Sequence, residues 1–415
     1  MRYSVRRRAD RGGKSSAVAV LALVVGATLG TTAGVANAAA GPSPNSSPSP
    51  AASAGLTAAL RADLTQYLDT QGTTDHFSAL SLRVTYPSTH PALAVSAGTT
   101  TYGGSTPVSD NALWQIGSNT KAFTSVVILQ LEAEGKLSIH DTLGKWLPQY
   151  PAWRNITIEQ LLSMTSGIPD DLGQDFFANA IQANPAQNFT LTGLIDSVVN
   201  LPLGPNTYSY SNTNYMLAQL IIERATHDSY FDQVAKRILV PLGLHDTCFA
   251  PETCPPSVAS RMPTGYSTSA DLPALLDTSV PKLAGTWAQA AGGLVSSLQD
   301  MTTWDRALYG GRELPAKQQR ELESLISITT SEPITTVTPE DPIGYGLGVA
   351  QRTDPVTGVT WSYVGEGIGY RVLHAYFPSS GLLIAIAVNS AVDSDTLPDF
   401  ADTVYQTLSA WHQQR

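Results

Sequence analysis

A serine and a lysine stand three residues apart, at Ser118 and Lys121, where a long apolar run begins. Residues at positions i and i+3 lie on the same face of a helix, so the amine can approach the hydroxyl and help to remove its proton. Gly117 permits close approach of another backbone segment. A serine in the first helical turn also offers its own N–H to an oxyanion. This stretch therefore predicts a nucleophilic serine with an adjacent proton acceptor.

The same spacing occurs a second time, at Ser279 and Lys282, with Pro281 between them. Proline inside a helix removes a hydrogen bond and clashes with the preceding turn, so these two side chains are poorly placed to share a helical face. We therefore expect only the copy at Ser118 to carry chemistry.

A second polar group, Tyr210 and Asn212, precedes a predicted helix that starts near Tyr215. Residues two apart in an extended turn point to the same side. A phenol with a pKa of about 10 is ionised about one time in a thousand at pH 7, and a neighbouring ammonium lowers that pKa. Tyr210 is a candidate general base if it meets Lys121 in space. The alternative is an aromatic cap on the helix.

Hydrophobic periodicity predicts the elements that position these groups. We expect a helix over 56–70, paired strands over 79–86 and 92–97, and a buried helix that ends at Gly135. Further helices are expected over 158–164, 190–200, 215–225, 230–239 and 397–412, and strands over 344–350, 360–364, 370–377 and 382–388.

This order predicts an α+β fold, in which an antiparallel sheet flanked by helices (56–142 and 262–415) carries an inserted all-helical subdomain (143–261). The cleft between the two parts is the expected site.

The first 38 residues have the pattern of a secretory signal peptide: basic residues at 6–8, an apolar run from Ala17, and small residues up to Ala38. The apolar run is interrupted by glycines and is shorter than the roughly 20 residues of a membrane span, so we expect cleavage rather than a retained anchor. Residues 39–55 are rich in Pro, Ser and Ala and are predicted to be a disordered linker. The expected location is therefore outside the cell, with attachment to the cell envelope left open.

With six of the 24 basic and one of the 34 acidic residues in the leader, the remaining chain carries a formal net charge of −15. That charge argues against a nucleic acid partner. No later segment is apolar enough to cross a membrane. The only two cysteines, Cys248 and Cys254, are expected to form a small-loop disulfide in an exported protein, with free thiols as the alternative.

Other hydrolytic classes lack their signatures here. The chain contains no Gly-x-Ser-x-Gly elbow and no His-Glu-x-x-His metal motif. Its seven histidines are scattered, and we assign none of them to catalysis. We expect neither a metal nor a cofactor.

The tetrapeptide Ser118-Asn119-Thr120-Lys121 and the tripeptide Tyr210-Ser211-Asn212 resemble motifs of the serine β-lactamase and penicillin-binding-protein family. The similarity is greatest to Streptomyces-type D-alanyl-D-alanine carboxypeptidases and class C-like hydrolases. The resemblance implies a β-lactamase/transpeptidase-like fold and an acyl-enzyme mechanism. Its substrates would be D-amino-acid peptides, β-lactams or small esters, with peptidoglycan as a further partner. It also implies that Asn212 orients substrate and that Phe176 and Trp287 wall the cleft.

The third motif of that family departs from its usual form. Relatives carry Lys-Thr-Gly or His-x-Gly where this chain has Tyr363-Val364-Gly365. By the resemblance, Gly365 lets substrate approach the strand and the N–H of Glu366 is the second oxyanion donor. Tyrosine carries no positive charge at neutral pH, so Arg352 or Arg371 would have to hold a substrate carboxylate, unless both are structural.

Each lost cationic contact weakens carboxylate binding by about 1.5 to 3 kcal/mol. The sequence therefore indicates a serine hydrolase shifted away from a strict carboxypeptidase. The alternative is a non-catalytic or weakly catalytic peptidoglycan- or penicillin-binding protein of the same fold.

Overall fold

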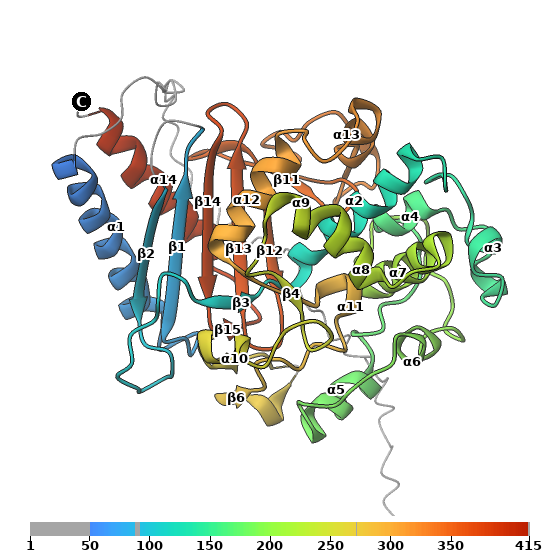
Figure 1. The fold of residues 1–415 in the computed structure, drawn as a ribbon, viewed down its shortest axis with the longest axis horizontal. Coiled ribbons are helices and arrows are strands. Elements are labelled where there is room, and N and C mark those ends of the chain that lie inside the picture. Colours follow the sequence, from blue (N-terminus) through green and yellow to red (C-terminus); the bar gives the residue numbers. More distant parts are fainter. Residues whose placement is uncertain (1–49, 88–91, 271, 414–415) are drawn as a thin grey trace, which may run out of the picture.

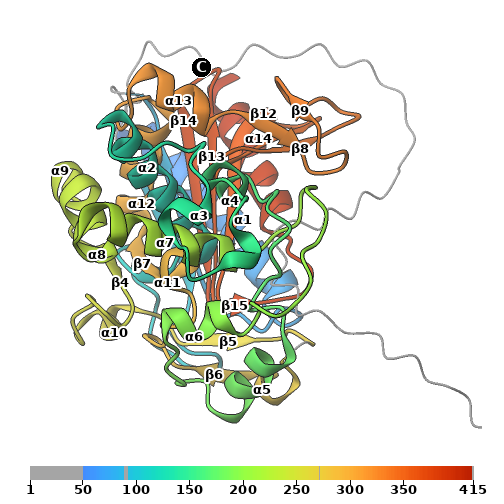
Figure 2. The same ribbon diagram turned by 90° about the vertical axis from the view of Figure 1, so that its right-hand side faces the viewer.

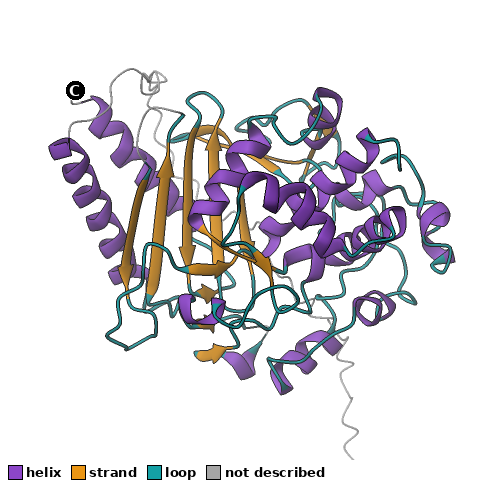
Figure 3. Cartoon of the chain, in the orientation of Figure 1, coloured by secondary structure: helices purple, strands orange, loops and turns teal. Residues whose placement is uncertain are grey.

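The computed structural model describes residues 50–87, 92–270 and 272–413. The predicted signal peptide and residues 39–49 of the predicted linker lie outside the described residues. Nine strands form one antiparallel sheet in the order β2-β1-β14-β13-β12-β11-β10-β8-β9, with helices on both faces (Figure 1, Figure 3). The prediction of an antiparallel sheet flanked by helices is confirmed.

The strands of the large sheet are β1 (Ala79–Thr85), β2 (Leu93–Gly98), β8 (Leu325–Ser327), β9 (Pro333–Ile334), β10 (Ile343–Tyr345), β11 (Ala350–Asp354), β12 (Gly358–Glu366), β13 (Arg371–Phe377) and β14 (Leu382–Val388). Two small sheets contain β3 (Leu113–Gln115), β4 (Cys248–Phe249) and β7 (Leu294–Ser297), and β5 (Gly265–Ser267), β6 (Thr278–Val280) and β15 (Ser390–Ala391). The longer helices are α1 (Pro50–Gln71), α2 (Thr120–Ala133), α5 (Asp175–Ala183), α7 (Asn212–Thr226), α12 (Leu298–Tyr309), α13 (Ala316–Leu322) and α14 (Leu397–Gln413). The shorter ones are α3 (Leu143–Trp146), α4 (Ile158–Leu162), α6 (Leu191–Asp196), α8 (Tyr230–Val234), α9 (Val240–Leu242), α10 (Val258–Arg261) and α11 (Gln289–Gly292).

Helices α1 and α14, from the two ends of the described chain, cover one face of the sheet (Figure 1). Leu60 and Leu64 of α1 and Val404 of α14 are buried there with the outward side chains of β1 and β14. Helix α1 begins at Pro50, so residues 50–55 of the predicted linker are helical. Proline is well tolerated in a first helical turn, and the alanines that follow favour helix.

Helix α2 is the central buried element on the other face (Figure 2). Eleven of its 14 residues are buried, which confirms the sequence expectation. Gly135 follows it with a φ of +70°, and the N–H of Lys136 donates to the carbonyl of Leu131. A left-handed glycine of this kind ends a helix by satisfying its last carbonyls.

One predicted strand was wrong. Residues 344–350 do not form a single strand, because the chain reverses between β10 and β11, which pair with each other. The N–H of Gly346 donates to the carbonyl of Val349, and Gly348 has a φ of +79°. A Cβ at Gly348 would lie 2.7 Å from the hydroxyl of Ser125 in α2. The glycines therefore form a tight turn that packs on the central helix.

The predicted helices between residues 143 and 261 are present as α4, α6, α7 and α8, the last continued by a π-helical turn, Ala235–Leu239. Helix α5 and the short strand β4 in this region were not predicted. Side chains from these helices join those of α2, β10 and β14 in one apolar cluster. A search of the described residues found no helix long and apolar enough to cross a membrane.

Candidate active site

Ser118 lies in a 3-10 turn, Gly117–Asn119, that leads directly into α2. Gly117 has a φ of +50°, and a Cβ there would lie 2.4 Å from the carbonyl oxygen of Glu366 at the end of β12. A side chain is therefore excluded at position 117. This close approach brings the backbone of Glu366 beside the serine turn.

Asn119 and His374 fix the same turn to the sheet. The Asn119 amide nitrogen donates to the carbonyls of Ile116 and Val372, so its Oδ1 is left to accept. That oxygen lies 2.9 Å from His374 Nδ1, which must carry the proton, while Nε2 accepts from the Tyr309 hydroxyl at 2.8 Å. Burial lowers the pKa of His374 to about 3, so the ring is neutral. No local sequence pattern indicates this contact between Asn119 and His374.

The amine of Lys121 lies against the serine, as the spacing predicted. Its Nζ donates to Ser118 Oγ at 3.1 Å, to Asn212 Oδ1 at 2.8 Å and to the carbonyl of Ala291 at 2.8 Å. The side chain has no solvent exposure. Burial lowers the pKa of Lys121 to about 7, against the opposing influence of Asp170 and Asp171.

Tyr210 also meets the serine. Its hydroxyl donates to Ser118 Oγ at 2.7 Å, and Lys121 Nζ lies 4.7 Å from the centre of its ring. Burial raises the pKa of Tyr210 well above its ordinary value, and its hydrogen bond with Ser118 acts in the opposite direction. The structure thus brings together Ser118, Lys121, Tyr210 and Asn212, from the start of α2 and the segment that leads into α7.

Two acids that the sequence analysis overlooked complete this group. Asp170 Oδ1 accepts from the backbone N–H of Asn212 at 2.7 Å and from its side-chain amide at 3.1 Å. Asp171 accepts from the hydroxyl of Thr213 at 3.0 Å. Adjacent acids directly after Gly167-Ile168-Pro169 were the available signal. The sequence could not indicate that they lie beside α7.

The third motif lies next to Tyr210. The Tyr363 hydroxyl donates to Tyr210 Oη at 3.3 Å. A Cβ at Gly365 would lie 1.9 Å from the carbonyl of Ile116, so glycine is required there because β12 contacts the serine turn. The Glu366 carboxyl accepts from the N–H of Val392 at 3.0 Å, and burial raises its pKa to about 8 although Arg371 opposes this.

Neither arginine considered as a carboxylate anchor contacts the serine. Of the two interpretations of Arg371, the structural one is confirmed: its side chain is completely buried and bonds Asp395 at 2.7 Å and Asp75 at 3.1 Å. The side chain of Arg352 makes no hydrogen bond or ion pair in the part of the chain that the structure describes, and its charge acts on Asp402 of α14. Arg371 is a structural arginine whose donors are already used.

The two predicted aromatic walls lie in different surroundings. Trp287 is buried, donates from Nε1 to the carbonyl of Ala284 and has its ring centre 5.9 Å from that of Phe177. Phe176 is 38% exposed at the start of α5. Phe177, not Phe176, is therefore the aromatic neighbour of Trp287.

Two further sequence predictions concern the cysteines and the second copy of the Ser-x-x-Lys spacing. Cys248 and Cys254 form a disulfide with a Cα–Cα distance of 5.1 Å, as expected. Ser279 lies in β6, and Lys282 donates to the carbonyls of Ala259 and Met262, so the rejected copy of the motif is not helical. Within the described ranges, no cluster of three or more His, Cys, Asp or Glu residues could hold a metal ion.

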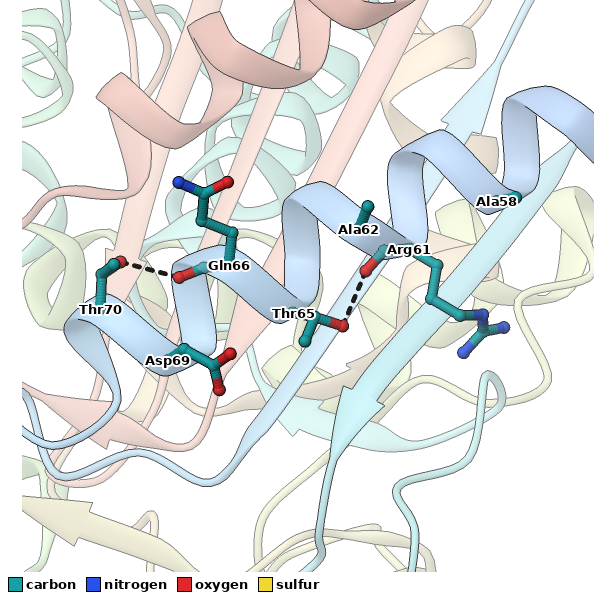
Figure 4. A pocket seen from close by; sticks show the side chains of 7 residues that line it. All are labelled: Ala58, Arg61, Ala62, Thr65, Gln66, Asp69 and Thr70. Atoms are coloured by element: carbon teal, nitrogen blue, oxygen red, sulfur yellow. Dashed lines mark hydrogen bonds between the residues drawn. The ribbon is translucent and has the colours of Figure 1, made fainter.

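A separate pocket lies along the exposed side of α1 (Figure 4). The hydroxyls of Thr65 and Thr70, which line it, donate to the carbonyls of Arg61 and Gln66 in the same helix. The pocket contains no residue of the serine group, and α1 lies at the opposite end of the sheet from α2 and α7 (Figure 1). It offers no arrangement for acyl transfer.

The β-lactamase family model matches residues 5–403, so the chain belongs to the β-lactamase family, a family of serine hydrolases. It is 30% identical to penicillin-binding protein 4* of Bacillus subtilis over 277 residues. The aligned region covers 64% of this chain and 58% of that protein. It is 31% identical over 202 residues to protein flp of Staphylococcus aureus, covering 47% of this chain and 38% of that protein. The chain therefore matches only part of the length of these curated relatives.

Solved structures agree on the fold. The D-stereospecific amidohydrolase from Streptomyces sp. is 25% identical with a TM-score of 0.68, covering 83% of this chain and 98% of that one. The D-amino acid amidase from Ochrobactrum anthropi SV3 is 21% identical with a TM-score of 0.70, covering 86% and 99% of the two chains.

Proposed function

We propose that this protein is a serine hydrolase that works through an acyl-enzyme formed at Ser118. The observation that carries the proposal is the convergence of Lys121 and Tyr210 on one oxygen, Ser118 Oγ, at 3.1 and 2.7 Å. A serine hydroxyl is a weak nucleophile until a neighbouring base accepts its proton. Two such groups, the completely buried Lys121 and the partly buried Tyr210, contact this hydroxyl.

Proton transfer follows from these contacts. As Ser118 Oγ bonds to the substrate carbonyl carbon, its proton passes to the pair formed by Lys121 and Tyr210. The same proton then goes to the leaving nitrogen or oxygen when the acyl bond to that atom breaks. Water attacks the acyl-enzyme by the reverse route and frees the serine. General acid–base catalysis of this kind is typically worth about 10²- to 10⁴-fold in rate.

The negative charge on the carbonyl oxygen needs two fixed donors. We assign these to the backbone N–H groups of Ser118 and Glu366. The close approach of Glu366 to Gly117 supports the assignment, since it brings the end of β12 against the serine turn. The side chain of Glu366 takes no part, because Val392 occupies its carboxyl.

The proposed substrates carry an amide, ester or β-lactam carbonyl next to an uncharged group. Tyr363 supplies a neutral phenol at the third motif, and Arg371 is held by two aspartates. A free carboxylate would find no ion pair there, which disfavours strict carboxypeptidase activity. The similarity to the D-stereospecific amidohydrolase supports D-amino-acid amides and peptides as the first substrates to test.

Intact mass spectrometry after incubation with a fluorescent penicillin or a phosphonate ester tests the nucleophile. We expect a single adduct on the wild type and none on Ser118→Ala. An adduct of unchanged yield on Ser118→Ala, or no adduct on the wild type with either reagent, would reject the assignment.

The absence of a cation at the third motif also favours a second candidate, a peptidoglycan- or penicillin-binding protein with little turnover. Hydrolysis of nitrocefin, p-nitrophenyl acetate and D-alanyl-D-alanine peptides separates the two candidates. Binding to peptidoglycan without turnover of any of them would favour the second. We further propose that the protein is exported, on the pattern of residues 1–38, and N-terminal sequencing of the mature protein tests this.

A further inference from the structure

Asp170 holds the start of α7 and the amide of Asn212 at the same time. One of its oxygens, Oδ1, accepts from the Asn212 backbone N–H at 2.7 Å and from Asn212 Nδ2 at 3.1 Å, and Oδ2 lies 3.4 Å from the same Nδ2. The other end of that amide, Oδ1, accepts from Lys121 Nζ at 2.8 Å. A single amide therefore joins the acid to the lysine.

These partners permit only one orientation of the Asn212 amide. Lys121 contacts it as a donor, and an ionised carboxylate can only accept. A flipped amide would direct its NH₂ group at the ammonium and its oxygen at the carboxylate, so both hydrogen bonds would be lost. The orientation that gives Lys121 its acceptor is thus determined by a residue that does not contact Lys121.

We propose that Asp170 is a positioning residue, which acts through Asn212 to hold Lys121 against Ser118 and to stabilise its protonated form. The inference rests on the proposed function of Lys121 and goes beyond it, because no part of that mechanism requires an acid at this place.

The charges around Lys121 allow the effect to be predicted. The loop before α5 contributes two acids, Asp170 and Asp171. Helix α7 contributes the ring of Tyr215, and the segment before it contributes the ring of Tyr210. Strand β12 contributes the phenol of Tyr363, which bonds Tyr210, and α11 has no titratable side chain.

Burial and the neighbouring Asp170 raise the pKa of Asp171 well above its ordinary value, so Asp171 is the carboxyl of the pair that more readily holds a proton. Burial also raises the pKa of Asp170, but the two N–H bonds from Asn212 and the charge of Lys121 oppose that shift, so the negative charge of the pair lies mainly on Asp170.

The matched test compares Asp170→Asn with Asp171→Asn. Removing the charge at position 170 makes the ammonium form of Lys121 less favourable, so the pKa of Lys121 should fall by about one unit. The midpoint of the acidic limb in the pH profile of kcat/KM should move to lower pH by the same amount. We expect kcat to fall about 10- to 100-fold with KM nearly unchanged. Asp171→Asn removes the carboxyl that more readily holds a proton and that bonds Thr213 rather than Asn212, so the limb should move by much less than in Asp170→Asn.

Two further variants and one titration separate this role from simple support of the fold. Asp170→Ser has a small polar side chain without charge, so it should reproduce the shift even if Asp170→Asn folds poorly. Asp170→Glu keeps the charge and should leave the limb near its wild-type position. A ¹³C-lysine NMR titration reports the pKa of Lys121 without turnover, so it remains decisive if the protein has no measurable activity.

The inference is overturned if the pKa of Lys121 is the same in Asp170→Asn and wild type, or if Asp171→Asn shifts it equally. A wild type that shows neither adduct nor turnover, but whose Lys121 titration still depends on Asp170, would reject the proposed function and leave the positioning role intact.

Discussion

The side-chain oxygen of Asn212 lies 2.8 Å from Lys121 Nζ, although 91 residues separate the two along the chain. Because the amide of Asn212 is held in turn by Asp170, the lysine next to the serine has a fixed acceptor as well as a fixed position. The ammonium form has three acceptors, one for each of its protons. The predictions below depend on this arrangement.

Tyr210→Phe should lower kcat for p-nitrophenyl acetate by about 10²- to 10⁴-fold, because it removes a proton carrier 2.7 Å from the serine oxygen. Steady-state kinetics with active-site titration measures the loss. Tyr208→Phe is the matched control, since the Tyr208 hydroxyl is buried and has no hydrogen-bond partner among the described residues. Equal losses in the two variants would argue against a role in proton transfer.

The rate of acylation should rise with pH through a midpoint near 7. Lys121 has a pKa lowered to about 7 by burial, and below that pH the lysine and Tyr210 both retain their protons. The pair then has no site to accept the serine proton, so kcat/KM falls as the pH falls. Such coupled groups titrate as a pair, and the observed midpoint belongs to both. A profile of phosphonate labelling between pH 5 and 9 measures it, and a flat profile would contradict the prediction.

Tyr363→Lys should shift specificity toward free carboxylates. The new ammonium would lie next to Tyr210, where a charge-assisted hydrogen bond contributes about 1.5 to 3 kcal/mol, or about 10- to 150-fold in kcat/KM. The measurement compares a D-alanyl-D-alanine peptide with its C-terminal amide in wild type and variant. Tyr363→Phe serves as the control, since it alters the phenol without adding charge. An unchanged ratio of the kcat/KM values for the two substrates would mean that the substrate carboxylate does not bind beside position 363.

Arg371→Met should destabilise the fold by about 3 to 5 kcal/mol, because two aspartates lose the buried cation that they share. Urea unfolding at pH 7 measures the change in the free energy of unfolding. Arg352→Met is the control and should change it by no more than about 0.5 kcal/mol, since Arg352 makes no ion pair within the described ranges. A small effect at position 371 would mean that the aspartates find other partners.

Local sequence patterns predicted most of the helices and strands named in the sequence analysis. The apolar run after Ser118 predicts a buried helix, and α2 is one. The spacing of Ser118 and Lys121 predicts their contact, because residues three apart on a helix are neighbours wherever that helix lies. The prediction of one strand over 344–350 was wrong because it used composition alone. The turn at Gly348 depends on its packing against α2, which composition does not reveal.

Contacts between distant segments were decided by the tertiary structure alone. The sequence left Arg371 open as a carboxylate anchor or a structural arginine, and the fold decides this by placing it between Asp75 and Asp395. It presents Asp170 as one of two acids in a loop, but the docking of that loop on α7 places it behind Asn212. Helical spacing is set by bonds between near neighbours and can be read from the chain. The partner of a buried charge depends on which segments the fold brings together, and only the three-dimensional structure contains that information.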